Sequence, residues 1–472
     1  GAAPYRKGQV LHSVFAAAKY KDSNVEWIDS VPEHWKASYL GFECSVKARL
    51  GWKGLKAEEY VDDGYVFLAT PNIKDNEVDF INVNRITKER YDESPEIILE
   101  KGDVLVTKDG STTGTTNIIR VLPEPATVNS SIAVLRSKGN VLSEYLYYFF
   151  VSEYTQNLIS RMRGGMGVPH LFQADLRKFY ILVPAKKEQG FIVNFLDHET
   201  TKIDIFIEKQ KQLIQLLKEK RQAVISHTVT KGLSPKAKMR DSGVRWLGEV
   251  PEHWGIGKIK NLSSIISKGT TPSTMGEKFE TTGIRFLKAE NIGKGFYVAP
   301  LPEFYISEKT DKLLSRSRLQ SKDVLVIIAG ATTGLSSVIQ EDLLPANTNQ
   351  AVSFIRPLNN AYSEYISYWL STEYAQSNIW QVAVQAAQPN LSMESLGNIY
   401  IPIPPENETK ELITHINFKL SKLAVLIENA KLAINLMQER RAALISATVT
   451  GKIDVRNWIA PKETQTNKEV AA

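Results

Sequence analysis

Two stretches of the sequence, residues 187–230 and 406–450, are each predicted to form one long helix. The first contains no proline and a single glycine, Gly190, close to its start. Mostly apolar residues along both stretches step by alternating threes and fours, which is the seam spacing of a coiled coil rather than the broad apolar face of a surface helix. The seam positions are Ile203, Ile207, Gln210, Ile214, Leu217, Arg221 and Val224 in the first stretch, and Leu423, Ile427, Ala430, Ile434, Met437, Arg441 and Leu444 in the second. At about 1.5 Å per residue such a helix spans roughly 60 Å, which is longer than a compact domain needs.

The two helices also end alike, in KRQAVISHTVT and RRAALISATVT, and the likeness extends upstream through a whole module. The opening segment KDSNVEWIDSVPEHW at 21–35 returns as RDSGVRWLGEVPEHW at 240–254. Further on, GDVLVTKDGSTTG at 102–114 matches KDVLVIIAGATTG at 322–334. Two unrelated amphipathic helices would share their period but not these sequences. The chain therefore contains a duplicated module whose framework persists while its interior has diverged.

The repeat sets the predicted domain map. Within each module, short β-type runs are broken by glycine, asparagine and aspartate, and a last strand leads through prolines into the long helix. The fold class is α/β. The map is an N-terminal tail at 1–20, a first module at 21–185, a long helix at 186–232, a linker at 233–245, a second module at 246–405, a second long helix at 406–450 and a C-terminal tail at 451–472.

Composition limits the class of protein. Hydrophobic content of 43% and charged content of 23% are ordinary for a soluble chain. No apolar run approaches the roughly 20 residues that a membrane span needs. The single cysteine, Cys44, excludes an internal disulfide and a multi-cysteine metal site, so we expect a cytoplasmic protein. The net charge of +6 permits nucleic acid as a partner without arguing for it alone.

Signatures of catalysis are missing. The sequence has no GxxxxGK[ST] phosphate loop, no GxGxxG dinucleotide turn, no HExxH metal motif and no Asn-Pro-Pro-aromatic or Asp-Pro-Pro-Tyr motif for a flipped base. His34 and His253 recur in the repeated PEHW segments, and we expect them to pack beside Trp35 and Trp254 rather than to catalyse. The DGSTTG and AGATTG loops are interpreted as tight turns whose hydroxyls could touch a DNA backbone. The chain is therefore predicted not to be an enzyme, or to be a subunit whose chemistry lies elsewhere.

Taken together, these motifs resemble the specificity (S) subunit of type I restriction–modification systems. The resemblance rests on the two VPEHW segments, the GDVL and KDVL strands with their TTG turns, the helix starts VPAKKEQ and IPPENET, and the shared helix ends, and it covers about residues 21–455. It implies two α/β target-recognition domains separated by two long helices that pack as an antiparallel coiled coil. Each domain would read one half of a bipartite, asymmetric DNA sequence, and the helices would set the spacing.

The same resemblance implies partners and a cofactor. Double-stranded DNA, two methyltransferase (M) subunits and, in the full complex, restriction (R) subunits are expected. S-adenosylmethionine would bind the M subunits, with no cofactor on this chain and no membrane partner. The charged helix ends suggest docking residues, namely Lys220, Arg221, Arg440 and Arg441.

Candidate DNA contacts lie in the polar and basic loops of each module. Arginine and lysine can pair with guanine, asparagine and glutamine with adenine, and hydroxyls with phosphate. In the first module they are Lys53, Lys108, Ser111, Thr112, Arg163 and His170. In the second they are Lys268, Thr270, Thr271, Thr332, Thr333, Gln385, Gln388 and Asn390.

Two alternatives remain open. A coiled-coil adaptor whose modules bind protein would show weak, salt-insensitive DNA binding, whereas a DNA reader would show steep salt dependence. A self-contained methyltransferase or nuclease would bind its cofactor alone, and the missing motifs count against it.

Overall fold

The computed structural model describes residues 19–25, 28–49, 55–74, 77–162, 170–383 and 389–461. It divides into two compact units, one formed by residues 1–210 with 432–472 and the other by residues 211–431. Each unit therefore combines one module with half of each long helix. The sequence-based map, which treated the helices as separate segments, missed this sharing.

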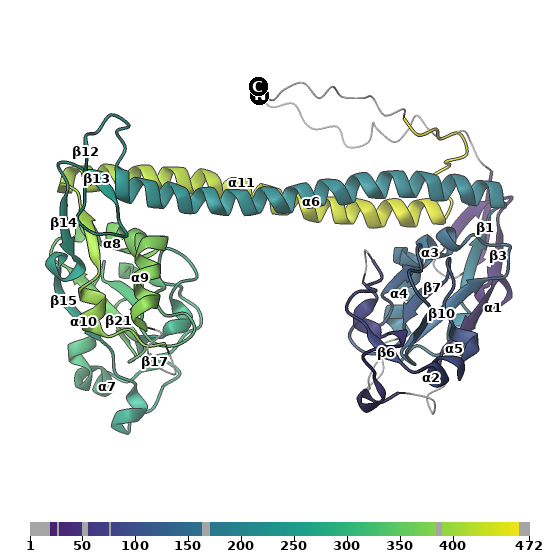
Figure 1. Ribbon diagram of the computed structural model, residues 1–472, viewed down its shortest axis with the longest axis horizontal. Helices are drawn as coiled ribbons and strands as arrows, with labels where there is room; N and C mark the ends of the chain where they lie inside the picture. Colours follow the sequence, from purple (N-terminus) through teal and green to yellow (C-terminus); the bar gives the residue numbers. More distant parts are fainter. Residues whose placement is uncertain are drawn as a thin grey trace. The chain divides into compact units, whose positions relative to one another are not determined.

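Both long helices are present, as α6 (Lys186–Lys231) and α11 (Glu406–Val449) (Figure 1). Each follows a proline-containing strand end and stops just before a glycine of positive φ, at +74° for Gly232 and +75° for Gly451. Such a left-handed glycine is a common helix terminator. A side chain at Gly451 would lie 2.4 Å from Pro32, so glycine is also needed there for space.

The predicted seam residues other than Arg221 are buried or half-buried within each unit. In the first unit Ile203 and Ile207 are buried on α6, and in the second Leu217 is buried on the same helix. On α11, Leu423 and Ala430 are buried in the second unit, whereas Arg441 of the first unit binds Asp204 with its Nε 3.0 Å from Oδ1. One predicted seam residue, Arg221, is exposed instead. A charged guanidinium is more stable in contact with water at the surface than buried in an apolar seam.

Each module is built on a four-stranded antiparallel sheet. In the first unit its order is β4-β10-β7-β8, and in the second β15-β21-β18-β19. The strands are β4 (Cys44–Lys47), β10 (Ile132–Ser137), β7 (Val104–Thr107) and β8 (Thr116–Ile118), and their counterparts β15 (Ser263–Lys268), β21 (Val352–Pro357), β18 (Val324–Ile327) and β19 (Ser336–Val338).

Smaller sheets complete the duplication. A three-stranded sheet contains one parallel pair in each module, β5 with β9 and β16 with β20. Its strands are β6 (Asn84–Ile86), β5 (Tyr65–Leu68) and β9 (Ala126–Val128), and β17 (Tyr305–Ile306), β16 (Ile284–Leu287) and β20 (Ala346–Thr348). Two-stranded pairs join β1 (Tyr20–Val25) to β2 (Ile28–Pro32), β3 (Lys36–Tyr39) to β11 (Tyr180–Val183), β12 (Met239–Asp241) to β13 (Glu249–Pro251) and β14 (Gly255–Lys258) to β22 (Tyr400–Ile403).

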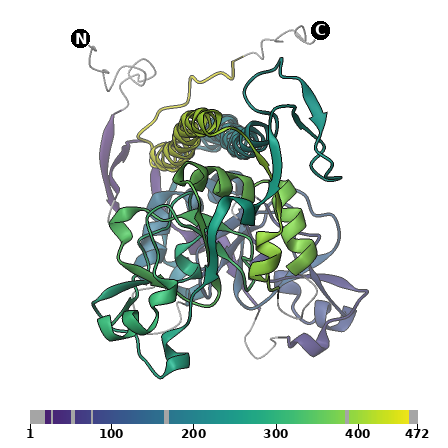
Figure 2. The same ribbon diagram turned by 90° about the vertical axis from the view of Figure 1, so that its left-hand side faces the viewer.

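Each module also contains short helices. In the first unit they are α1 (Leu40–Glu43), α2 (Lys88–Asp92), α3 (Ser143–Val151), α4 (Glu153–Met162) and α5 (Gln173–Arg177), and in the second α7 (Glu308–Leu313), α8 (Ser363–Leu370), α9 (Glu373–Ala383) and α10 (Met393–Gly397). Buried Tyr365 of α8 donates its hydroxyl to the carbonyl of Val229 on α6, and Tyr368 donates to Asn417 on α11. Figure 2, in which the second unit faces the viewer, shows α8 next to both long helices.

The main core of the first unit contains residues from the far end of the chain. Ile445 and Val449 of α11, and Val455 beyond it, are buried with the aromatic side chains of α3. Ile453 and Trp458 pack against the same core. The predicted C-terminal tail at 451–472 therefore begins too early, because residues 451–458 belong to the first unit.

The repeated PEHW segments bind the first turns of the long helices. His34 Nε2 lies 2.8 Å from Glu188 Oε2, and the indole N–H of Trp35 donates to Glu188 Oε1 at 3.0 Å. In the second unit His253 Nε2 lies 2.8 Å from Glu408 Oε2. His253 packs edge-on against Trp254 as expected, with ring centroids 6.4 Å apart, but the histidines also have a role that the sequence analysis missed. They pair with glutamates placed where a helix N-terminus favours negative charge.

Candidate nucleic-acid interface

In each module two polar turns that are far apart in sequence meet at one end of the four-stranded sheet. The TTG turn follows β7, and the backbone N–H of Leu171 donates to the Lys108 carbonyl at 3.0 Å. In the second module the N–H of Leu391 donates to the Ile328 carbonyl at 2.8 Å. Isolated bridges join Asp109 to His170, and the equivalent Ala329 to Asn390. Candidates chosen from separate loops are thus brought together.

The TTG turns have a rigid inner side and an open outer side. Thr113 donates its hydroxyl to the Gly110 carbonyl, and Thr333 to the Gly330 carbonyl, each at 2.7 Å. Thr333 is only 1% exposed, so its hydroxyl stabilises the turn and offers no surface to a ligand. Ser111, Thr112 and Thr332 are exposed, and hydroxyls in such positions can donate to phosphate oxygens.

Lys108 is not the exposed loop residue that its sequence context suggests. It is 5% exposed, and desolvation lowers the pKa of its ammonium, against a smaller opposing effect of Asp109. The carboxylate of Asp109 pairs with His170 Nδ1. In the second module these three positions are Ile328, Ala329 and Asn390. The same framework therefore presents different chemistry at the same place.

A further group of candidates lies at the same end of the second module's sheet. Lys268 is exposed at the end of β15, while Thr270 and Thr271 are half-buried. Gly269 between them donates its N–H to Val352 of the neighbouring strand, and a side chain there would lie 1.8 Å from the Thr348 carbonyl oxygen. The glycine is thus required by the close approach of the two backbones. The candidates Lys53, Arg163, Gln385 and Gln388 lie outside the described residues.

Sequence reasoning missed Arg49, which occupies in the first module the position of Gly269. Its side chain is buried, its Nε donates to the Val128 carbonyl at 3.3 Å, and its Nη1 lies 3.8 Å from Glu93. These contacts join β4 to β9, so Arg49 supports the platform that carries the candidate turns. The sequence signal that could have identified Arg49 is its position directly after a predicted β-strand.

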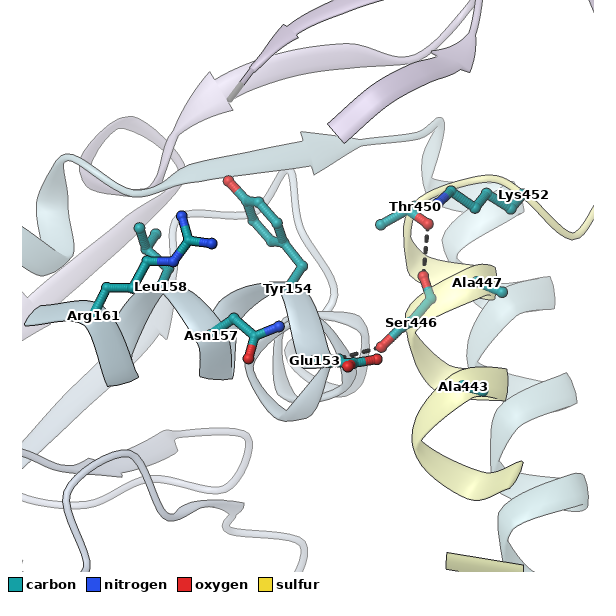
Figure 3. Close-up of a pocket in the computed structure, with 10 residues that line it drawn as sticks. All are labelled: Glu153, Tyr154, Asn157, Leu158, Arg161, Ala443, Ser446, Ala447, Thr450 and Lys452. Carbon is teal, nitrogen blue, oxygen red and sulfur yellow. Dashed lines mark hydrogen bonds between the residues drawn. The ribbon is translucent and has the colours of Figure 1, made fainter. Parts of the chain in front are cut away.

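A cavity among the described residues of the first unit lies away from these turns. It has a volume of about 450 Å³ and opens between α4 and the end of α11, where the N–H of Glu153 donates to Ser446 Oγ (Figure 3). Its lining mixes charged, polar and small side chains: Glu153, Tyr154, Asn157, Leu158, Arg161, Ala443, Ser446, Ala447, Thr450 and Lys452. Within the described part of the chain, no group of three or more histidine, cysteine or acidic side chains could hold a metal ion.

The predicted docking residues divide into two kinds. Lys220, Arg221 and Arg440 are exposed, whereas Arg441 is engaged by Asp204. Sequence reasoning also missed large apolar side chains that are exposed at matching positions of the two long helices. They are Ile205, Phe206 and Leu216 on α6, and Val425, Leu426 and Leu436, each 220 residues later, on α11. The signal was present in the sequence as apolar residues repeated outside the seam.

No helix in the described ranges is both long enough and apolar enough to cross a membrane.

Comparison with known proteins gives consistent likenesses. The sequence profile of the Type I restriction modification DNA specificity domain matches twice, at residues 51–216 and 251–436, and so covers well over half of the chain. The MjaVIII specificity subunit of Methanocaldococcus jannaschii is 24% identical over 448 residues, which is 93% of this chain and 98% of that protein. The EcoKI specificity subunit of Escherichia coli is 21% identical, with 82% of each chain covered.

Solved structures share the fold. A chain from a study of complex assembly and conformational transition of the type I R-M system superposes with a TM-score of 0.68 at 16% identity, covering 89% of this chain and 98% of the other. The HsdS subunit from Thermoanaerobacter tengcongensis gives a TM-score of 0.52, also at 16% identity, with the same coverage.

Proposed function

Since this chain belongs to the family of type I restriction modification DNA specificity domains, we propose that it is the DNA-reading subunit of a restriction–modification complex. The observation that carries the proposal is the duplicated module, whose framework is kept while its turn residues differ. Lys108, Asp109 and His170 in one module stand where Ile328, Ala329 and Asn390 stand in the other. Two such surfaces are suited to reading two different half-sites.

The chemistry of the turns is that of a DNA contact. Exposed hydroxyls and cations can bind phosphates, and asparagine can pair with adenine through its amide. Phosphate contacts release counterions, so binding should weaken steeply with salt. Affinity that is weak and insensitive to salt would favour a protein-binding adaptor instead.

A module exchange tests independent reading. Residues 36–185 make a well-bounded cassette, because β3 at its start pairs with β11 at its end. Replacing this cassette with that of a relative should change one half of the recognised sequence and leave the other half intact. The readout is selection of bound or methylated sites from a randomised DNA library, and a change in both halves would contradict independent reading.

The long helices supply a surface for the partner subunits. In the second unit the exposed apolar residue Leu216 lies on the same flank of α6 as the predicted docking residue Lys220, by the geometry of about 100° per residue. In the first unit Leu436 and Arg440 repeat this flank on α11. A flank present twice suits two copies of the same partner, and we identify that partner as the methyltransferase subunit.

Charge reversal on that flank should weaken assembly. Lys220→Glu combined with Arg440→Glu places carboxylates beside the apolar residues, so co-elution with the methyltransferase subunits should fall while the chain stays folded. Lys218→Glu is the control for Lys220→Glu alone, because it makes the same charge change about 200° away around α6. If the double variant and the control co-elute equally well with the methyltransferase subunits, this flank is not the docking surface.

On this proposal the chain is not itself catalytic. S-adenosylmethionine would bind the methyltransferase subunits, restriction subunits would join the full complex, and the whole would work in the cytoplasm, where the DNA is. Calorimetry of the purified chain should give no heat of S-adenosylmethionine binding, while the assembled complex should bind the cofactor. Binding by the chain alone would favour a self-contained methyltransferase.

A further inference from the structure

Lys108 occupies a position that the fold reserves for an apolar side chain. Side chains alternate along a strand, and Val104 and Val106 of β7 contribute to the main core of the first unit. Lys108 comes two residues later and shares their side of the sheet. At the equivalent place in the second module stands Ile328, which is 3% exposed and belongs to that unit's main core. A cation has thus replaced a core residue on a retained framework.

Among the described residues the Lys108 ammonium has no hydrogen-bonding partner, and only the charge of the neighbouring Asp109 opposes its desolvation. The residue is 5% exposed, and no described residue makes a hydrogen bond or ion pair with its Nζ. Its neighbour Asp109 is engaged by His170. A buried cation without a partner is unfavourable, and its long stem allows the ammonium to lie towards the surface while the methylenes stay covered. Such a conflict between a side chain and its surroundings is typical of functional positions.

The surroundings of Lys108 are open to an anion. Ser111 and Thr112 in the following turn are exposed. At Gly110 nothing lies within 4 Å of where a side chain would begin, so a ligand can approach the backbone. An anion docked on the two hydroxyls of this turn would lie three to four residues along the chain from Lys108, whose long stem can carry the ammonium towards it. Phosphate oxygens are suited to such a set of donors.

We propose that Lys108 is a phosphate-binding residue of the first module, whose ammonium takes a backbone phosphate of bound DNA, and that the second module has no counterpart at this position. The inference rests on the proposed DNA-reading function and adds an asymmetry to it. The first module gains a phosphate contact at the place where the second keeps a core residue.

The test compares Lys108→Met and Lys108→Ile with the unchanged chain, each assembled with its methyltransferase subunits. Isoleucine is the residue that the second module uses. Lys101→Met is the matched control, because Lys101 is exposed at the opposite end of β7 and its loss removes the same charge. DNA affinity is measured between about 50 and 200 mM salt, and thermal unfolding is recorded in parallel.

Both Lys108 variants should unfold at the same or a higher temperature, because a buried unpaired charge is removed. Their affinity for DNA should fall roughly tenfold, as expected for a lost charge-assisted hydrogen bond. The slope of log affinity against log salt should become shallower by about 0.9, the value for one phosphate contact. Lys101→Met should leave both quantities close to those of the unchanged chain.

Lys108 variants that match Lys101→Met in affinity and slope would overturn the inference, and so would variants that fail to fold, since the ammonium would then serve the structure. If the unchanged chain shows no salt-dependent DNA binding, the proposed function itself is contradicted. The two failures are therefore distinguishable.

Discussion

At the scale of single residues, the glutamates at the starts of the long helices are the clearest anchors. Glu188 accepts from Trp35 and pairs with His34, and its side chain is 12% exposed. Glu408 pairs with His253 and is 26% exposed, while the indole nitrogen of Trp254 is buried with no partner in the described structure. The PEHW motif of the first unit therefore makes a tryptophan hydrogen bond to its long helix that the motif of the second unit lacks in the described structure.

Replacing Glu188 should cost more stability than replacing Glu408. Glu188→Ala removes a charge-assisted hydrogen bond and leaves the Trp35 indole unpaired, so we expect a loss of about 1.5 to 3 kcal/mol in the free energy of unfolding. Glu408→Ala removes an ion pair to a histidine whose side chain is 54% exposed, and should cost no more than about 1 kcal/mol. Chemical denaturation of the two variants measures the difference. Equal losses would mean that the indole bond contributes nothing.

The thiol of Cys44 should be inert in the folded protein. Burial raises its pKa to about 12 from an ordinary value of 9.0, so the reactive thiolate is absent at neutral pH. Because the folded state holds this proton more tightly than the unfolded state, stability should fall as pH rises from about 9 towards 12. Ellman's reagent at pH 8 should react only after denaturant is added. Rapid labelling of the native chain would show that the thiol is accessible.

Sequence reasoning located the candidate turns but not the exposure of each residue in them. The TTG repeats and the polar loops before Leu171 and Leu391 were visible as patterns. The burial of Lys108 and Thr333 was not, because it depends on which side of β7 or β18 a residue faces and on what packs there. The sharing of Arg49 between β4 and β9 is likewise a tertiary contact that no local pattern encodes.

At the scale of elements, the long helices were predictable almost to the residue, because period, proline and glycine all agree at their ends. α6 is one continuous helix that begins in the first unit and ends in the second. Its length exceeds what burial of one seam requires. We infer that the helix pair sets the spacing between the half-sites that the modules read.

Lengthening both helices by one heptad should lengthen the spacer in the recognised DNA. Seven residues inserted after Gln212 and after Leu432 keep both seams in phase and add about 10 Å. B-DNA advances about 34–36 Å per turn of 10–10.5 base pairs, so the spacer should grow by roughly three base pairs. Both half-sites should stay the same, with some loss of affinity because the second groove rotates by roughly 100°. Methylation mapped over randomised spacers is the measurement, and an unchanged spacer in a folded, active variant would contradict it.

At the scale of the whole molecule, the first unit is completed by the end of the chain. Ile445, Val449 and Val455 lie in its main core, and Tyr20 donates its hydroxyl to the Gly451 carbonyl at 3.0 Å. Deleting residues 451–472 should therefore loosen the first unit and spare the second. Hydrogen exchange should show faster exchange in α3 and unchanged exchange in α8. Equal changes in both helices would indicate that the two units unfold together.

The sharing of the helices also fixes an order of events during synthesis. The second unit is contiguous, from residue 211 to residue 431, and all of its residues are translated before α11 is finished. The first module is translated earlier, yet its core lacks Ile445, Val449 and Val455 until residue 455 has been added. The module that is made first is thus the one completed last. Until then it carries an uncovered apolar face, so a message that ends prematurely yields a chain whose earliest part is the less stable one.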